Sequence, residues 1–397
     1  MSIDFLSPVI YICRVDGKGL LGFRPKKADP TRKTRQENIM QTGLSLRDLA
    51  AKLETESHQK KDMIVNTGST ELVVFNGDLH LDTQDNGGGL YLLRPLAHDQ
   101  LAEHIDVPLR YYRRMHRDAP QLLADNVNTW LHRKPEPRMF RTMAGKGRAW
   151  LSNRYLRVEN ELIAEVALNA LLANGMRPNQ IVSCNVTETK LYIQAVMPSI
   201  KALVKGSRQI GDVMQGGVII TNSEVGKGRI DVSEFDFRLI CLNGMVGQSL
   251  FKKTHLGGAL DGDEALLRDD TKRTMDDALI LQIRDMIAAA INPERFQARI
   301  ESMENLTRKE IEGNPAESVK VLTKVLGPAV GLTEKEEGSI LNALIRGGDV
   351  SAWGLLNAVT AQANTETDYD RAVELEAAGG KLLAMPAPEW AQILKAA

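Results

Sequence analysis

GVIITNSEVGKGRIDVSEFDFRLICLNGMV, residues 217–246, is the stretch from which the fold class can be predicted. Residues that favour strands occur in two runs, and the turn signal Gly226-Lys227-Gly228 separates them. A third apolar segment follows and ends at Asn243-Gly244. We therefore expect a β-hairpin and a further strand-like segment here.

The chain before this stretch mixes helix and strand signals. Apolar residues at helical spacing begin at Leu44, and residues 160–175 form a clearly amphipathic pattern. The strand-like runs share alternating or clustered apolar residues, and they fall at 63–67, 71–76, 78–83, 90–96, 138–143, 148–155 and 181–198. A glycine-containing stretch at 206–217 is predicted as a loop.

After about residue 260 the strand signals stop. Helical patterns follow, near 263–291, 316–326, 334–346, 351–364 and 369–378, and Thr333 with Glu336 forms a candidate capping box. The predicted fold class is therefore α+β, a strand-rich mixed body with flanking helices followed by an all-helical C-terminal region. We predict three parts, namely a basic arm at 1–36, an α+β body at 37–260 and an acidic helical domain at 261–397.

Charge divides at the same place. Residues 1–260 hold 35 Lys+Arg and 27 Asp+Glu, a balance of +8, whereas residues 261–397 hold 15 and 24, a balance of −9. The stretch RPKKADPTRKTR, within the predicted arm, contributes to the excess. Such an asymmetry indicates a basic body that meets a polyanion and an acidic tail that masks it. The alternative is two solvated surfaces that differ by chance.

Several classes of protein are excluded by motifs that the sequence lacks. No apolar run is long enough for a membrane span, and the three cysteines form no C-x-x-C pair, so we expect a cytoplasmic protein. Neither Gly145-Lys146-Gly147 nor Gly226-Lys227-Gly228 has the spacing of a phosphate-binding loop. The seven histidines show no zinc-binding spacing. We therefore expect no cofactor and no metal, and an enzyme is the less favoured reading.

Residues 97–116, AHDQLAEHIDVPLRYYRRMH, have the pattern of two helices joined by a tight turn. Asp106 is placed to cap the second helix and Pro108 suits its first turn. This resembles a helix-turn-helix, whose second helix carries Arg110, Arg113, Arg114 and Arg117. The alternative is local packing with a basic outer face.

The most basic part of the body runs from 108 to 157, with twelve Lys+Arg and three Asp+Glu. Arginines alternate there with Phe140, Trp150 and Tyr155 in two predicted strands. Such a surface tracks phosphates while its rings stack on bases. The same alternation also fits rings in the core and arginines on the solvated face.

Several segments together resemble the phage and plasmid-like proteins that carry domain of unknown function 932. They are LAHDQLAEHIDVPLRYYRRM (96–115), RAWLSNRY (148–155), ITNSEVGKGRIDVSEFDFRLICLNGMV (220–246), KKTHLGG (252–258) and GLLNAVTAQANTETDYDRAVELEAAGG (354–380). The resemblance covers about residues 40–390. It implies a mobile-element origin and a bacterial host cell, and it supplies no catalytic residues.

The leading hypothesis is a protein that binds nucleic acid, with single-stranded DNA favoured, in replication, recombination or DNA protection. The arginines and lysines would contact phosphates, and Trp150 and Tyr155 would stack on bases. The predicted contacts are Arg113, Arg114, Arg117, Arg138, Arg141, Lys146, Arg148, Trp150, Arg154, Tyr155, Lys227 and Arg229. A homo-oligomer would suit an annealing protein, although no sequence pattern fixes its symmetry.

Two other hypotheses belong to different classes. In one, the acidic helical tail binds a host protein, as an interaction or counter-defence factor, and the charge of the body is incidental. In the other, Asn222, Glu224, Asn243 and His255 assemble an enzyme site, because their polar side chains border apolar segments.

Overall fold

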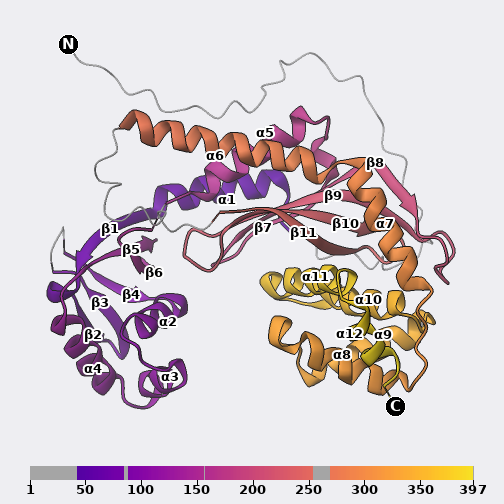
Figure 1. Ribbon diagram of the computed structural model, residues 1–397. Helices are drawn as coiled ribbons and strands as arrows, with labels where there is room; N and C mark the ends of the chain where they lie inside the picture. The colour runs from indigo at the N-terminus through magenta and orange to yellow at the C-terminus, as the bar shows by residue number, and fades with distance from the viewer. Residues whose placement is uncertain (1–42, 85–87, 156, 254–268, 397) are drawn as a thin grey trace, which may run out of the picture. The chain divides into compact units, whose positions relative to one another are not determined.

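The computed structural model describes residues 43–84, 88–155, 157–253 and 269–396 (Figure 1). All of them belong to one compact unit. The fold is mixed α+β, as predicted, and its described C-terminal region is helical. The predicted basic arm at 1–36 lies outside the described residues, as does the segment 254–268 that contains the predicted body boundary.

The first sheet has six strands in the order β1-β5-β6-β4-β3-β2. Its strands are β1 (Lys60–Asn66), β2 (Glu71–Phe75), β3 (Asp78–Asp82), β4 (Leu90–Leu93), β5 (Pro137–Met143) and β6 (Lys146–Ser152). The β5–β6 hairpin closes through Ala144 and Gly145, which both have positive φ, as a two-residue hairpin turn requires. β1 pairs antiparallel with β5, so that Asp62 lies opposite Arg141.

Three helices pack against one face of this sheet. They are α2 (Pro95–His104), α3 (Leu109–Asp118) and α4 (Pro120–Arg133). Tyr112 of α3 and Leu123 of α4 join Phe140 and Trp150 of the strands in a single buried cluster. The aromatic residues of β5 and β6 are therefore core residues.

The second sheet has five antiparallel strands in the order β11-β10-β9-β8-β7. Its strands are β7 (Ile181–Val186), β8 (Leu191–Leu203), β9 (Val213–Asn222), β10 (Ile230–Arg238) and β11 (Asn243–Lys253). The hairpin predicted from residues 217–246 is present as β9 and β10. The third segment differs from the prediction, because Asn243-Gly244 begins β11 instead of ending a strand.

The predicted loop at 206–217 is also shorter than expected, since β9 begins at Val213. Two of its four glycines, Gly216 and Gly217, lie inside the strand for a packing reason. A Cβ at Gly217 would meet the carbonyl oxygen of Ala195 at 2.0 Å, and one at Gly216 would meet the ring of Phe296. Glycine here permits close approach within a sheet and does not mark a loop.

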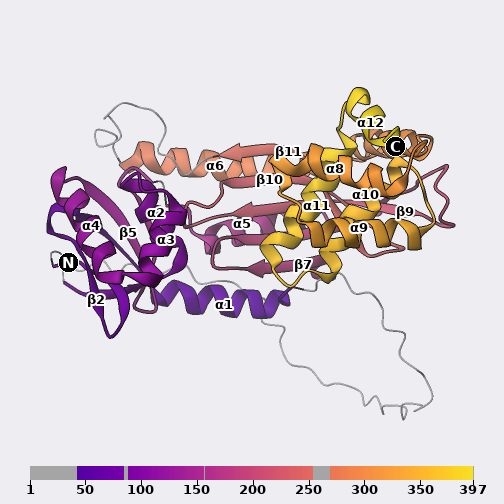
Figure 2. The ribbon, with the colours of Figure 1, turned by 90° about the horizontal axis from the view of Figure 1, so that it is seen from below.

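Helices cover both faces of the second sheet (Figures 1 and 2). On one face lie α1 (Leu46–Gln59), α5 (Asn160–Ala173) and α6 (Asp269–Ala290), and on the other lie α10 (Ala352–Thr360) and α11 (Tyr369–Leu383). The remaining helices are α7 (Pro293–Thr307), α8 (Pro315–Val330), α9 (Glu334–Gly347) and α12 (Ala387–Leu394). Short 3₁₀ helices occur at Thr67–Ser69, Pro178–Gln180 and Ala361–Thr365.

The capping box predicted at Thr333 and Glu336 is confirmed at the start of α9. Helices α4, α7 and α12 were not predicted, although each begins at or just after a proline that suits a first turn. Among the described helices, none combines the length and the apolar character needed to cross a membrane.

Candidate functional site

Burial divides the predicted nucleic-acid contacts into two groups. Four of them are in the interior, because their exposed fractions are 0% for Arg141, 6% for Arg148, 2% for Trp150 and 8% for Tyr155. The prediction that these four meet phosphates and bases directly is therefore wrong. Both faces of β5 and β6 are covered, so the alternation of arginine and aromatic residues does not create a solvated face.

The two rings are held by hydrogen bonds in addition to packing. The Trp150 indole donates to Nδ1 of His104 at 2.9 Å, and the Tyr155 hydroxyl donates to the Ser223 carbonyl at 2.8 Å. His104 also lies 2.9 Å from the Glu136 carboxylate. Stacking on a base would require either ring to leave these partners.

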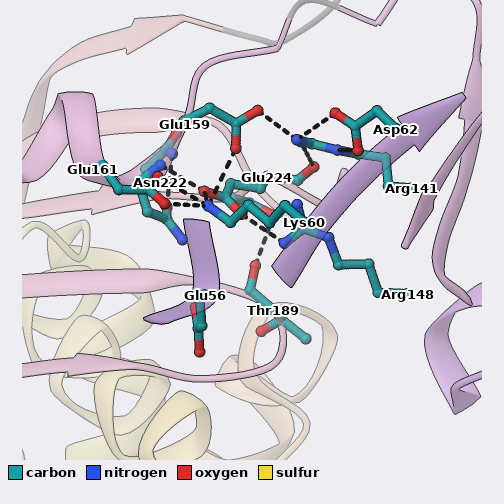
Figure 3. Close-up of polar contacts among 12 residues, drawn as sticks. Glu56, Lys60, Asp62, Arg141, Arg148, Glu159, Glu161, Thr189, Asn222 and Glu224 are labelled. Carbon is teal, nitrogen blue, oxygen red and sulfur yellow. Dashed lines mark hydrogen bonds and ion pairs between the residues drawn. The ribbon is translucent and has the colours of Figure 1, made fainter. Parts of the chain in front are cut away.

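The buried arginines belong to a charge cluster between the two sheets, which we define as Lys60, Asp62, Arg141, Arg148, Glu159, Glu161 and Glu224 (Figure 3). Strands β1, β5 and β6 of the first sheet supply four members. The start of α5 and the turn after β9 supply the three glutamates. The cluster joins parts of the chain that are up to 164 residues apart.

Arg141 is fully enclosed by oxygen atoms. It binds Asp62 through two hydrogen bonds of 2.9 Å each, and it donates to the Glu224 carbonyl at 2.7 Å. A further bond goes to Glu159. Burial alone would lower the pKa of Arg141, but its carboxylate partners outweigh this and raise the pKa. Arg141 therefore remains charged, and its guanidinium group is bonded to groups of the protein itself and is not available to a ligand.

Lys60 and Glu224 form the centre of the cluster. The Lys60 ammonium lies 2.8 Å from Glu161, 3.3 Å from Glu159 and 2.5 Å from Glu224. Glu224 also accepts from Arg148 at 2.6 Å. Burial would raise the pKa of Glu224, but Arg148 and Lys60 outweigh it and lower the pKa to about 2. This carboxylate stays ionised at neutral pH, so it does not offer a proton for general acid catalysis.

The glutamates of the cluster also have the arrangement of a metal site. Oxygen atoms of Glu159, Glu161 and Glu224 lie within 4.8 Å of one another. The Lys60 ammonium contacts all three carboxylates, and a divalent cation would have to displace it. As it stands, the cluster is an ion-pair network that holds the two sheets together.

The enzyme site predicted from Asn222, Glu224, Asn243 and His255 is not assembled. Asn243 pairs with Arg238, which pairs with Met214, and Asn222 lies eight residues further along β9. At roughly 3.3 Å per residue, Asn222 and Asn243 are about 26 Å apart at opposite ends of the sheet. The Asn243 amide instead donates to Thr360. His255 lies outside the described residues.

The second group of predicted contacts is on the surface of α3. Tyr112 and Met115 face the core, and the arginines occupy the opposite side of the helix. The side chains of Arg113, Arg114 and Arg117 are 63%, 73% and 74% exposed. Positions three and four apart share one face of a helix. We call Arg110, Arg113, Arg114 and Arg117 the arginine face, and together with Leu109 they line an open hollow.

The arginine face has weak internal partners. Arg113 donates to Asp99 at 2.6 Å, and Arg117 donates to Asp118 at 2.7 Å. Arg114 lies 3.9 Å from Asp118, and within the described residues Arg110 has no ion pair. Exposed ion pairs of this kind are screened by solvent and contribute little to stability. Four guanidinium groups against two carboxylates leave an excess of positive charge that an anion can use.

The helix-turn-helix pattern is present as α2 and α3, but its turn differs from the prediction. Asp106 does not cap α3, because it takes a left-handed conformation with φ of 56° between the helices. Pro108 precedes the first turn, and the helix begins at Leu109 with no side-chain cap. Tyr111, 52% exposed, stands beside the arginine face.

The remaining predicted contacts lie elsewhere. Lys146, Arg154, Lys227 and Arg229 are exposed. Arg138 is half-buried beside Glu136 at 3.3 Å, and burial lowers its pKa. The structure thus does not unite the twelve predicted residues in a single surface.

The charge cluster was missed by sequence reasoning. Glu224 borders apolar segments, which suggested an enzyme site, and in the structure it lies in the turn after β9. Its cations, Lys60 and Arg148, are 164 and 76 residues away in the chain. No local pattern in the sequence signals such distant pairs.

The chain was compared with family models, with curated proteins and with solved structures. No family model, no curated protein and no solved structure matches this chain. The resemblance to proteins that carry domain of unknown function 932 stays a prediction.

Proposed function

We propose that this protein binds nucleic acid and that the arginine face of α3 contacts the phosphates. The observation that supports the proposal is the exposure of four arginines along one helix face, where they line a common hollow. Two other arginines of the same basic stretch, Arg141 and Arg148, are buried and therefore do not belong to the exposed surface. The surface for a polyanion is therefore narrower than the sequence predicts.

Guanidinium groups suit this ligand. A planar guanidinium binds a phosphate through two parallel hydrogen bonds, and such charge-assisted bonds are roughly twice as strong as neutral ones. The partners that Arg113 and Arg117 have now, Asp99 and Asp118, are exchangeable because these ion pairs are exposed. On binding, phosphate oxygens would replace the carboxylates of Asp99 and Asp118 as the partners of these arginines.

The ring that remains available near this surface is Tyr111. With Trp150 and Tyr155 buried, base stacking in the proposal depends on Tyr111 and not on the β5 and β6 strands. An arginine-faced second helix also suits the major groove of a duplex. Both single-stranded and duplex DNA therefore belong in the test. The proposed role is in replication, recombination or protection of DNA, and the family resemblance adds only that this DNA would belong to a mobile element.

The test is a titration of labelled single-stranded and duplex DNA with the full chain over a salt series. The variant Arg114→Ala/Arg117→Ala removes two exposed charges from α3. We expect it to weaken binding about tenfold at low salt. On duplex DNA it should also lower the slope of log K against log salt by about 1.8, since each phosphate contact contributes about 0.9.

The matched control is Lys335→Ala/Arg346→Ala on α9, which removes two exposed charges from another helix. It should bind as the unmodified protein does. Arg114→Lys/Arg117→Lys should keep most of the salt dependence, because the charges remain. Absence of binding by the unmodified protein at low salt would overturn the proposal, as would equal losses in the α3 and α9 variants.

A further inference from the structure

A second group of exposed cations lies where the two sheets meet. The turn between β9 and β10 carries Lys227 and Arg229, both exposed, and neither forms an ion pair within the described part of the chain. The turn is fixed at its base, where the Lys227 backbone N–H donates to the Ser223 hydroxyl at 3.0 Å. Gly226 takes a φ of 76° that permits the reversal. Two unpaired cations are thus held on a defined turn.

A third exposed cation lies on the segment after β6, which contacts the base of this turn. Tyr155 follows β6, and its hydroxyl donates to the carbonyl of Ser223 at the base of the turn. The preceding residue, Arg154, is exposed. We call Arg154, Lys227 and Arg229 the junction cations. They come from two segments about seventy residues apart in the sequence, which the fold brings into contact through Tyr155 and Ser223.

The junction cations are connected to the arginine face through one helix. In α2, Gln100 donates to the carbonyl of Val225 at 2.7 Å, at the start of the turn. The adjacent residue, Asp99, binds Arg113 of the arginine face. A chain of direct contacts therefore runs from α3 through α2 to the turn. In both ribbon views, the ends of β9 and β10 that join at this turn point toward α2 (Figures 1 and 2).

The acidic groups on or beside this path include Asp99 and the exposed Glu103 of α2 and the exposed Glu188. Gln100 is neutral, and Asp99 is engaged by Arg113. Glu188, in the neighbouring turn after β7, lies 3.5 Å from Arg94 and is 69% exposed. The carboxylate of Glu224, three residues before Lys227, is buried against its own cations.

We propose that the ligand is a polynucleotide that spans both groups, with consecutive parts of its phosphate backbone on the arginine face and on the junction cations. This inference rests on the proposed function. It names the ligand as a chain of phosphates and excludes a mononucleotide or free phosphate, which reaches one group alone. Once one group holds the polymer, the other meets it at high effective concentration, and affinity rises steeply with length.

The test is a length series of oligonucleotides from about 6 to about 40 nucleotides, which brackets the roughly 4–16 nucleotides of common single-strand sites. The variant is Lys227→Ala/Arg229→Ala, and both side chains are exposed, so the fold should be unaffected. We expect affinity for the shortest oligonucleotide to change less than about twofold. For the longest, affinity should fall about tenfold, with a smaller salt slope.

Comparison with Arg114→Ala/Arg117→Ala separates the two proposals. If the α3 variant loses affinity at every length and the turn variant loses none, the spanning ligand is overturned and the proposed function stands. If the turn variant loses affinity while the α3 variant does not, the arginine face is overturned. If the turn variant lost the same factor in affinity for oligonucleotides of every length, a ligand that spans both groups would also be contradicted. Such a result would mean that even the shortest oligonucleotide contacts the turn.

Discussion

The two arginines of the charge cluster and the four of the arginine face come from one basic stretch of sequence, residues 108–157, and they differ in what surrounds each arginine. Arg141 is completely buried and meets Asp62, Glu159 and the carbonyl of Glu224. Arg114 is 73% exposed, and its nearest carboxylate lies 3.9 Å away. A charge count therefore does not say which arginines are available. Availability depends on carboxylates that arrive from other parts of the chain.

The largest expected effect comes from breaking the charge cluster. Arg141→Leu removes the buried cation that Asp62 and Glu159 share, and of the two carboxylates Glu159 keeps Lys60 at 3.3 Å. Loss of one partner from a buried ion pair costs about 3–5 kcal/mol. We expect the free energy of unfolding to fall by that amount in urea denaturation. Arg114→Ala should change it by less than about 0.5 kcal/mol. A similar change in the free energy of unfolding for both variants would contradict the view that Arg141 stabilises the fold and Arg114 does not.

A second effect concerns a buried carboxylate that has no cation. Glu376 of α11 accepts a hydrogen bond from Gln194 of β8, and among the described residues it has no ion pair. Burial raises its pKa to about 7 from an ordinary value of 4.5, and the bond from Gln194 opposes this rise. Glu224, with two cations, shows the opposite shift. The comparison isolates the influence of paired cations on a buried acid.

The sign of the resulting pH dependence follows from linkage. Because the folded pKa of Glu376 is raised, its contribution to stability is present below pH 4.5 and is lost as pH rises toward 7, by about 3 kcal/mol in total. Glu224 contributes above pH 4.5 and loses its contribution as pH falls toward 2. The check is urea denaturation from pH 4.5 to 8 of the unmodified protein and Glu376→Gln. Parallel curves would contradict the assignment.

The smallest expected effect sharpens the arginine face. Asp118→Asn removes the carboxylate that Arg114 and Arg117 share. Because exposed ion pairs are weak, DNA affinity should rise by only about threefold at low salt. The matched control is Asp285→Asn on α6, where Arg284 and Asp285 form a similar exposed pair. The control should leave affinity unchanged. Tightening by both variants would indicate a general charge effect.

Local patterns predicted much of the fold. The alternation in residues 138–155 places β5 and β6, and Thr333 with Glu336 marks the start of α9. The arginines of α3 were also found from helical spacing. These signals are local, because they depend on neighbours within a few residues.

Burial of the β5 and β6 arginines could not be predicted in the same way. Arg141 is 79 residues from Asp62 and 83 residues from Glu224. Alternation shows that two faces differ, but it does not show that the turn after β9 and the residues that begin α5 cover the outer one. The enzyme site failed for a related reason, because the register puts Asn222 and Asn243 at opposite ends of one sheet.

The most direct test of the central claim is the salt dependence of duplex DNA binding by a variant with all four arginines of α3 replaced by glutamine. The claim is that phosphates meet the exposed arginine face, and four lost contacts should lower the slope of log K against log salt by about 3 to 4. The unmodified protein should bind with the full slope. An unchanged slope in the variant would show that the phosphates are contacted elsewhere and would contradict the account.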